Sequence, residues 1–123
     1  MPIVDIEMVC KSEADFNAVS ARTLADAVGH AFNSEAGRTW VRMRYLDHRA
    51  YAENETEATH AADLPVFVTI LKAHPPAIQA LSEEILKITE VVAACVGCSP
   101  QRVHVQYAPA AAGRQAFGGK LVE

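Results

Sequence analysis

The sequence lacks the features that mark three large classes of protein. None of its 123 residues forms an apolar run long enough to span a bilayer, so no membrane role is expected. Acidic residues outnumber basic ones, and the formal net charge of −4 argues against nucleic acid as a partner. No basic segment followed by an apolar one marks a secretion signal at the start. We therefore expect a protein of the cytoplasm.

Metal-binding residues are also sparse. Cys95 and Cys98 have the spacing of a redox motif or of half a zinc site, but no second pair completes a set of four ligands. Both cysteines lie where a helix is expected to end, so we interpret them as small buried hydrophobes and leave a redox role open. His30, His48, His60 and His74 show no metal-ligand spacing. We expect neither a metal nor a cofactor.

One strand–helix–strand pattern is present, and its first copy occupies the first half of the chain. Residues 2–9 alternate apolar with polar side chains, as a half-buried strand does. Ser12 is typical of a helix N-cap, and Leu24 and Val28 lie on one face of the helix that follows. Residues 39–45 alternate again and predict the second strand.

The second half of the chain repeats this order. Residues 64–71 are rich in β-branched side chains and predict a strand. Pro75 and Pro76 are typical of a helix start, and apolar residues then recur in steps of three or four until Gly97. Residues 102–107 alternate and predict the closing strand. Pro65 stands in this copy where Pro2 stands in the first.

The two copies together predict a single α+β domain over residues 1–123, with a four-stranded sheet and two helices on one face. The first unit covers about 2–54, an acidic connector about 55–63, and the second unit about 64–123. A strand–helix–strand unit favours parallel strands. The opposite face of the sheet either meets other subunits or faces water, and it carries Asp5, Glu7, Trp40, Arg42, Arg44, Arg102, His104 and Gln106.

Pro2 directly follows the initiator methionine. Removal of Met1 is favoured by a small second residue and would leave a secondary amine at the chain start. An α-amino group titrates near ~8, and burial in an apolar pocket lowers its pKa because the charged form is desolvated. Such an amine would be a suitable general base at neutral pH. The alternative is that Pro2 is only the first residue of a strand, where proline is tolerated.

With these features the chain resembles the tautomerase superfamily, in the type with two fused units. The resemblance rests on the Met-Pro start, the repeated unit, and Gly118 and Gly119 after the last strand. Residues 99–107 are similar to a segment of the macrophage migration inhibitory factor group. Residues 116–121 resemble the C-terminal hairpin of bacterial tautomerases, whose single-unit type is 4-oxalocrotonate tautomerase. The resemblance implies a homotrimer with pseudo-sixfold symmetry and sites at the subunit boundaries.

The function implied by this resemblance is that of a cofactor-free isomerase. A keto–enol tautomerase of this kind would act on a small unsaturated or 2-oxo carboxylate, with Pro2 as the base. The implied substrate-binding residues are Arg42, Arg44, Lys72, His104, Gln106 and Phe117. Lys11 departs from the arginine that many tautomerases carry just after the first strand, and Lys72 or Arg44 could take over its role.

Other functions stay open at this point. The same fold could serve a hydratase, a decarboxylase or a dehalogenase of unsaturated acids, in which Glu7 or Glu53 would activate water. Tyr51 could line a pocket or pack. A non-catalytic trimeric binding protein is a third reading. A duplicated ferredoxin-like module, whose strands would pair antiparallel, is the remaining alternative.

Overall fold

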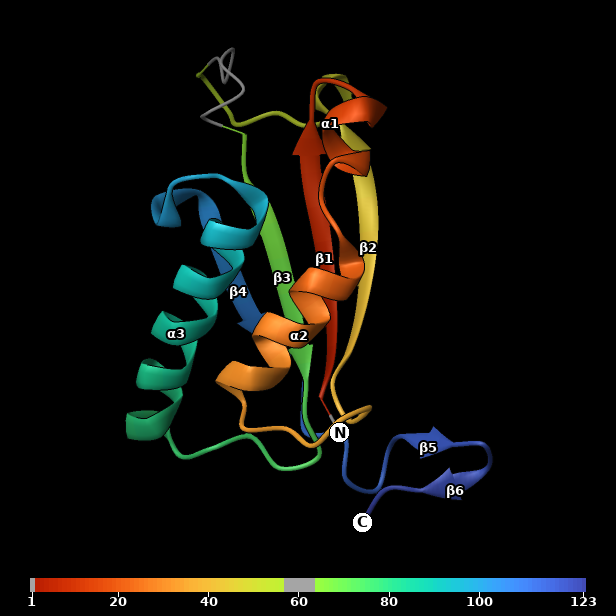
Figure 1. Cartoon of the computed structure of the whole chain (residues 1–123). Helices are drawn as coiled ribbons and strands as arrows, with labels where there is room; N and C mark the ends of the chain where they lie inside the picture. Colours follow the sequence, from red (N-terminus) through yellow and green to blue (C-terminus); the bar gives the residue numbers. More distant parts are fainter. Residues whose placement is uncertain (1, 57–63) are drawn as a thin grey trace.

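A single four-stranded sheet forms the centre of the computed structural model, which describes residues 2–56 and 64–123. β1 (Ile3–Cys10) runs parallel to β2 (Trp40–Asp47), and β3 (Val66–Leu71) runs parallel to β4 (Val103–Tyr107). The strand order is β2-β1-β3-β4, and β1 and β3 join the two halves in antiparallel fashion. Figure 1 shows the helices on one face of this sheet. The predicted α+β architecture is confirmed, and the parallel pairs rule out the ferredoxin-like alternative.

The two halves of the sheet are related by a local twofold axis. The axis passes through the pair formed by Ile6 and Val68. In both halves, hydrogen-bonded side chains on the two parallel strands lie 37 positions apart in the sequence: Asp5 and Arg42 in the first, Thr69 and Gln106 in the second. An axis perpendicular to the sheet at this pair exchanges Ile6 with Val68 and keeps every side chain on its own face of the sheet. Two residues earlier in each strand, Val4 is therefore equivalent to Val66. By this register Leu64, and not Pro65, is equivalent to Pro2. The alignment of the two prolines expected from the sequence is therefore wrong by one residue.

The first half has two helices where the sequence predicted one. α1 (Glu13–Asn17) is capped by Ser12, as predicted, through the Ser12 hydroxyl and the Asp15 N–H at 3.2 Å. α2 (Ala21–Ala31) begins anew because the Ser20 hydroxyl accepts a hydrogen bond from the Thr23 N–H at 3.1 Å. A serine that caps a backbone N–H competes with a continuous helix, which explains the break.

The core lies between the sheet and the two longer helices. α3 (Ile78–Val96) buries Ile88 and Val92, and α2 buries Leu24 and Val28, against inward side chains of β1 and β3. Each fully buried aliphatic side chain contributes roughly 1.5–3 kcal/mol. The predicted apolar stripe of α3 does not hold at its start, because Ile78 is 74% exposed. Gly97 ends the helix in the left-handed conformation, with φ 78°, as predicted.

The chain closes with a small hairpin that stands off the body of the molecule near the chain start (Figure 1). It consists of β5 (Ala116–Phe117) and β6 (Lys120–Leu121), paired antiparallel within the predicted 116–121 hairpin. Gly118 and Gly119 form its turn with φ values of 55° and 87°, which side chains rarely allow. Over residues 2–56 and 64–123, no helix has the length and apolar character needed to cross a membrane.

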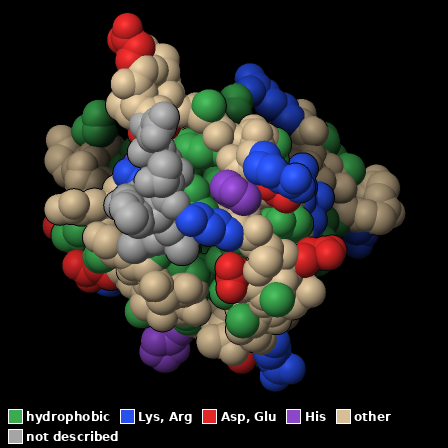
Figure 2. Space-filling view, turned by 90° about the horizontal axis from the view of Figure 1, so that it is seen from above, with side chains coloured by type: hydrophobic (Ala, Val, Ile, Leu, Met, Phe, Trp, Pro, Cys, Tyr) green, Lys and Arg blue, Asp and Glu red, His purple; other side chains and the backbone are tan. Residues whose placement is uncertain are grey.

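The far end of the sheet carries charges of both signs. η1 (His48–Ala50) follows β2 there, and Arg49 Nη2 lies 3.1 Å from Asp47 Oδ2. η3 (Pro100–Arg102) precedes β4, so Arg102 lies outside the strand in which the sequence placed it; its Nη2 lies 3.3 Å from Glu53 Oε2. Figure 2, which looks onto this end, shows Lys and Arg side chains next to Asp and Glu. Most of the connector expected at about 55–63 lies outside the described residues.

Candidate functional site

Pro2 is buried at the start of β1, at the opposite end of the sheet. Its carbonyl accepts a hydrogen bond from the Trp40 N–H at 3.0 Å, which fixes the residue beside the start of β2. Two hollows open onto Pro2, with volumes of about 150 Å³ and about 460 Å³. Met1 lies outside the described residues, so its removal stays a prediction.

The smaller hollow has an aromatic wall. The Trp40 ring meets the Phe117 ring edge-on at 5.0 Å between centroids, and Trp40 Nε1 donates a hydrogen bond to the Gly37 carbonyl at 2.9 Å. Pro2, Ile3 and Arg38 complete the lining. An apolar wall disfavours the charged form of a neighbouring amine and so lowers its pKa. The hairpin thus brings Phe117, a residue predicted for the site, next to Pro2.

The larger hollow has two cations in its lining. Lys72 follows β3 and lies beside Pro2, because β1 and β3 are antiparallel and the end of one meets the start of the other. Arg38 lines both hollows. The other side chains at this hollow are Phe32, Asn33, Ser34 and Glu35. Two cations beside a buried proline could bind an anionic substrate.

Arg38 was missed by the sequence analysis. It belongs to no alternating pattern, since it lies in the loop just before β2. The signal that could have found it is the parallel pairing itself, because parallel strands begin at the same edge and place residue 38 beside Pro2.

The two cations differ in how far they are already paired. Lys72 Nζ lies 2.7 Å from Glu84 Oε1 and 4.5 Å from the centroid of the Phe32 ring. Arg38 is exposed, and within residues 2–56 and 64–123 no carboxylate pairs with its guanidinium. Of these two cations, Arg38 is therefore the one whose charge has no carboxylate partner among the described residues.

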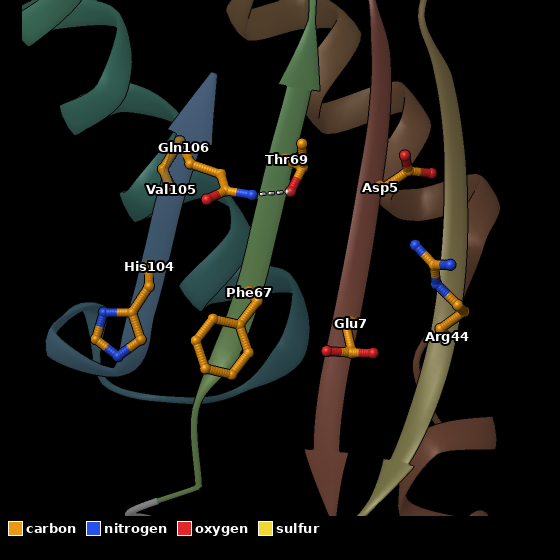
Figure 3. A pocket seen from close by; sticks show the side chains of 8 residues that line it. All are labelled: Asp5, Glu7, Arg44, Phe67, Thr69, His104, Val105 and Gln106. Carbon is orange, nitrogen blue, oxygen red and sulfur yellow. Dashed lines mark hydrogen bonds between the residues drawn. The ribbon is translucent and has the colours of Figure 1, made fainter. Parts of the chain in front are cut away.

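The remaining predicted site residues do not meet Pro2 within one chain. They lie on the open face of the sheet, where Figure 3 shows three of them, Arg44, His104 and Gln106, around a hollow of about 480 Å³. Gln106 Nε2 donates a hydrogen bond to Thr69 Oγ1 at 3.0 Å, and the ring of His104 packs against that of Phe67 at 5.6 Å. Arg44 lies next to Glu7 across the β1–β2 pair.

Arg42 lies on the same face and is bound to a neighbouring carboxylate. Its Nε and Nη2 donate to the two oxygens of Asp5 at 2.6 and 2.9 Å. This bidentate pair raises the pKa of Arg42. Its guanidinium is thus engaged inside the chain, and a role toward substrate stays a prediction.

Three residues whose roles the sequence left open lie away from Pro2. The Tyr51 hydroxyl donates to Glu53 Oε2 at 2.6 Å, which lowers the pKa of Glu53 and raises that of Tyr51. The Tyr51 ring lies 5.9 Å from that of Phe67, near the start of β3. Lys11 lies just after β1, at the end farthest from Pro2.

The cysteines are placed as packing residues. Cys10 is buried and Cys95 and Cys98 are half-buried, and all three are free thiols. Burial raises the pKa of each, which leaves less of the reactive thiolate. Among residues 2–56 and 64–123, no group of three or more His, Cys, Asp or Glu side chains is placed to hold a metal.

No family model and no curated protein matches the sequence, but solved structures match the fold. A fused 4-OT, described as a symmetric trimer, is 14% identical with TM-score 0.68, covering 98% of this chain and 94% of its own. The FG41 malonate semialdehyde decarboxylase, inhibited by 3-bromopropiolate, is 16% identical with TM-score 0.66 and covers 94% and 90%. A macrophage migration inhibitory factor homologue from Prochlorococcus marinus is 10% identical with TM-score 0.69 and covers 98% and 99%.

These likenesses extend over almost the whole of this chain and of each matching chain. At such identities they establish the fold. The chain has the fold of the tautomerase superfamily, as the resemblance predicted.

Proposed function

We propose that this protein is a cofactor-free isomerase, a keto–enol tautomerase of small unsaturated or 2-oxo carboxylates, with Pro2 as its base. The observation that carries the proposal is the position of Pro2. It is buried between an aromatic wall, formed by Trp40 and Phe117, and two cations, Arg38 and Lys72. A hydrophobic wall, a base and a site for an anion are what such a reaction requires. A cytoplasmic location, expected from the sequence, is part of the proposal.

The chemistry follows from the Pro2 amine and the four side chains around it. Once Met1 is removed, the neutral amine of Pro2 accepts a proton from the enol hydroxyl, and the electrons of the O–H bond form the carbonyl. The C=C electrons take the proton back from the prolinium at carbon, which completes the ketone and restores the free amine. Arg38 would bind the substrate carboxylate, and the aromatic wall would keep the amine neutral.

We further propose that the working form is a homotrimer. Within residues 2–56 and 64–123 no second layer covers the open face of the sheet, which holds Arg42, Arg44, His104 and Gln106. These residues reach a Pro2 only if that proline belongs to a neighbouring copy. A matching fused 4-OT is described as a symmetric trimer, which supports this assembly. Sedimentation velocity should then give three times the chain mass of 13.3 kDa.

The test of the base compares two proline variants. We expect Pro2→Ala to slow the ketonisation of phenylenolpyruvate by about 10²–10⁴-fold, the usual contribution of a positioned base. Pro65→Ala is the matched control, because it removes a buried proline that has no free amine. Intact mass should show that Met1 is absent, and 3-bromopropiolate should add to wild type but not to Pro2→Ala. Equal rates in both variants would remove Pro2 from the mechanism.

A second candidate is a decarboxylase or hydratase on the same scaffold. Glu35 lines the larger Pro2 hollow and could activate water, and a malonate semialdehyde decarboxylase shares the fold. Release of CO₂ from malonate semialdehyde faster than phenylenolpyruvate turnover would favour this reading, and Glu35→Gln should then abolish water addition. Retained Met1 in the mature protein would instead favour a non-catalytic binding role.

A further inference from the structure

Three polar side chains from different elements meet behind the larger Pro2 hollow. Lys72 follows β3, Glu84 lies on α3, and Tyr107 ends β4. Glu84 Oε1 lies 2.7 Å from Lys72 Nζ, and Glu84 Oε2 accepts a hydrogen bond from the Tyr107 hydroxyl. The side chains of Lys72 and Glu84 are only 20% and 18% exposed. The carboxylate of Glu84 is thus engaged at both oxygens.

This arrangement fixes the ammonium of Lys72 from two sides. Glu84 holds one of its N–H groups, and the face of the Phe32 ring lies 4.5 Å from Nζ. Tyr107 stays a donor over the whole neutral range, because burial and its bond to Glu84 raise its pKa well above the ordinary value. An ammonium has three donors, so Lys72 keeps donors beyond the one given to Glu84. Lys72 also lines the hollow that contains Pro2.

Lys72 and Arg38 therefore suit different parts of an anionic substrate. The Lys72–Glu84 pair has no net charge, so it attracts a distant carboxylate weakly, but its ammonium is a fixed local donor. A fixed donor is most effective against charge that develops during the reaction, since no reorganisation is needed at that moment. Arg38 is exposed and unpaired within residues 2–56 and 64–123, which suits the carboxylate already present on the free substrate.

We propose that Glu84 and Tyr107 are positioning residues, which hold Lys72 as the hydrogen-bond donor to the substrate oxygen that gains negative charge as Pro2 takes the proton. This inference rests on the proposed tautomerase function. No proton leaves Lys72: its N–H strengthens a hydrogen bond to the enolate oxygen and relaxes when carbon is protonated. The other charged groups in the lining of this hollow are Glu35 and Arg38.

The kinetic experiment separates this role from a purely structural tie between α3 and the sheet. We expect Glu84→Gln and Tyr107→Phe each to lower kcat on phenylenolpyruvate by about tenfold or more, because a charge-assisted contact is lost or loosened. KM should change by less than about threefold, since ground-state binding rests on Arg38. Glu84→Asp should recover part of kcat. Glu83→Gln, an exposed neighbour on the same helix, is the control and should match wild type.

A second readout does not depend on turnover. Trace acylation of the folded protein with acetic anhydride, followed by peptide mass analysis, reports how accessible the Lys72 amine is. Acylation of Lys72 should rise severalfold in Glu84→Gln and stay unchanged in Glu83→Gln. Thermal unfolding of each variant shows whether the fold is kept, and Glu84→Asp supplies a second variant if Glu84→Gln does not fold.

The outcomes distinguish the two levels of the proposal. A lower kcat with an unchanged KM, together with faster Lys72 acylation, supports the positioning role. An unchanged kcat in Glu84→Gln and Tyr107→Phe, with Pro2→Ala inactive, overturns the positioning role and leaves the proposed function standing. Absence of turnover in wild type with a free Pro2 overturns the proposed function and this inference with it.

Discussion

Replacing Arg38 by alanine tests the proposal that this residue binds the substrate carboxylate beside Pro2. Arg38 lines both hollows at Pro2, and no carboxylate pairs with it in the described parts of the chain. Its removal therefore breaks no internal ion pair and should leave the fold intact. Lys72 gives the contrast, because its charge is already matched by Glu84. We expect Arg38→Ala to weaken reaction with carboxylate substrates while the unfolding temperature stays close to that of wild type.

The size of the effect follows from the exposure of the site. A fully solvated ion pair contributes only about 0.2–1 kcal/mol, whereas a hydrogen bond to a charged group shielded by substrate contributes about 1.5–3 kcal/mol. Substrate that fills the hollow excludes water from Arg38, so the second range applies. At about 1.36 kcal/mol per factor of ten, kcat/KM should fall about ten- to hundredfold. Arg38→Lys should lose less, because it keeps the charge but not the bidentate geometry.

The assay compares phenylenolpyruvate with its methyl ester, which lacks the carboxylate charge. Wild type should prefer the acid, and Arg38→Ala should lose most of this preference. Arg114→Ala, which removes an exposed arginine near the hairpin, is the control. If Arg38→Ala keeps the wild-type ratio of kcat/KM for acid over ester, Arg38 does not bind the carboxylate and the reasoning is wrong.

Three further predictions concern stability. Ile88→Ala should lower the free energy of unfolding in urea titrations by about 2–5 kcal/mol, since the side chain is fully buried. Leu86 is exposed, so Leu86→Ala should change it by less than about 0.5 kcal/mol. Similar losses in the two variants would contradict the placement of Ile88 in the core. Gly97→Ala should lower the free energy of unfolding by about 1–2 kcal/mol. The cause would be the φ of 78° alone, because an added Cβ meets no atom within 4 Å. An unchanged free energy of unfolding would refute backbone strain at this position. The pKa of Tyr107 is higher in the folded protein than in the unfolded chain, where it is near ~10. The contribution of Tyr107 to stability is therefore complete below the unfolded pKa and is lost as pH rises through the folded pKa. From pH ~9 upward, the free energy of unfolding measured in urea should fall more steeply for wild type than for Tyr107→Phe.

The sheet and its two-unit organisation could be predicted because burial follows a simple period. Val4 and Ile6 alternate with Asp5 and Glu7, and the structure places the first pair in the core and the second on the open face. The ends of α3 were also marked, by two prolines and by Gly97. Such signals are local, so no knowledge of the partner strand is needed to read them.

The break between α1 and α2 shows where local signals compete. Ser20 lies in an otherwise helical stretch, and its hydroxyl caps α2 just after α1 ends at Ala18. The exposure of Ile78 is a related case. Its position fits the apolar stripe of the helix, but whether other residues cover it is decided by tertiary packing.

The site was only partly predictable, because its residues meet through register. Lys72 and Phe117 were expected at the site, and the structure puts both next to Pro2. Arg38 joins them because β1 and β2 pair in parallel. This pairing produces no recognisable sequence pattern in the loop that contains Arg38. Glu84 reaches Lys72 from a helix twelve positions away. The roles of Arg42 and His104 depend on a neighbouring copy and stay predictions.

The local twofold axis has a practical consequence for anyone who expresses this protein. Leu64 occupies the place equivalent to Pro2, and it sits mid-chain, so its nitrogen is always an amide. Any affinity tag or fusion partner added in front of Pro2 would likewise convert the Pro2 nitrogen into an amide, and the proposed base would be lost. Purification handles therefore belong after Glu123, and an inactive preparation with a leading tag does not test the activity proposed for a free Pro2.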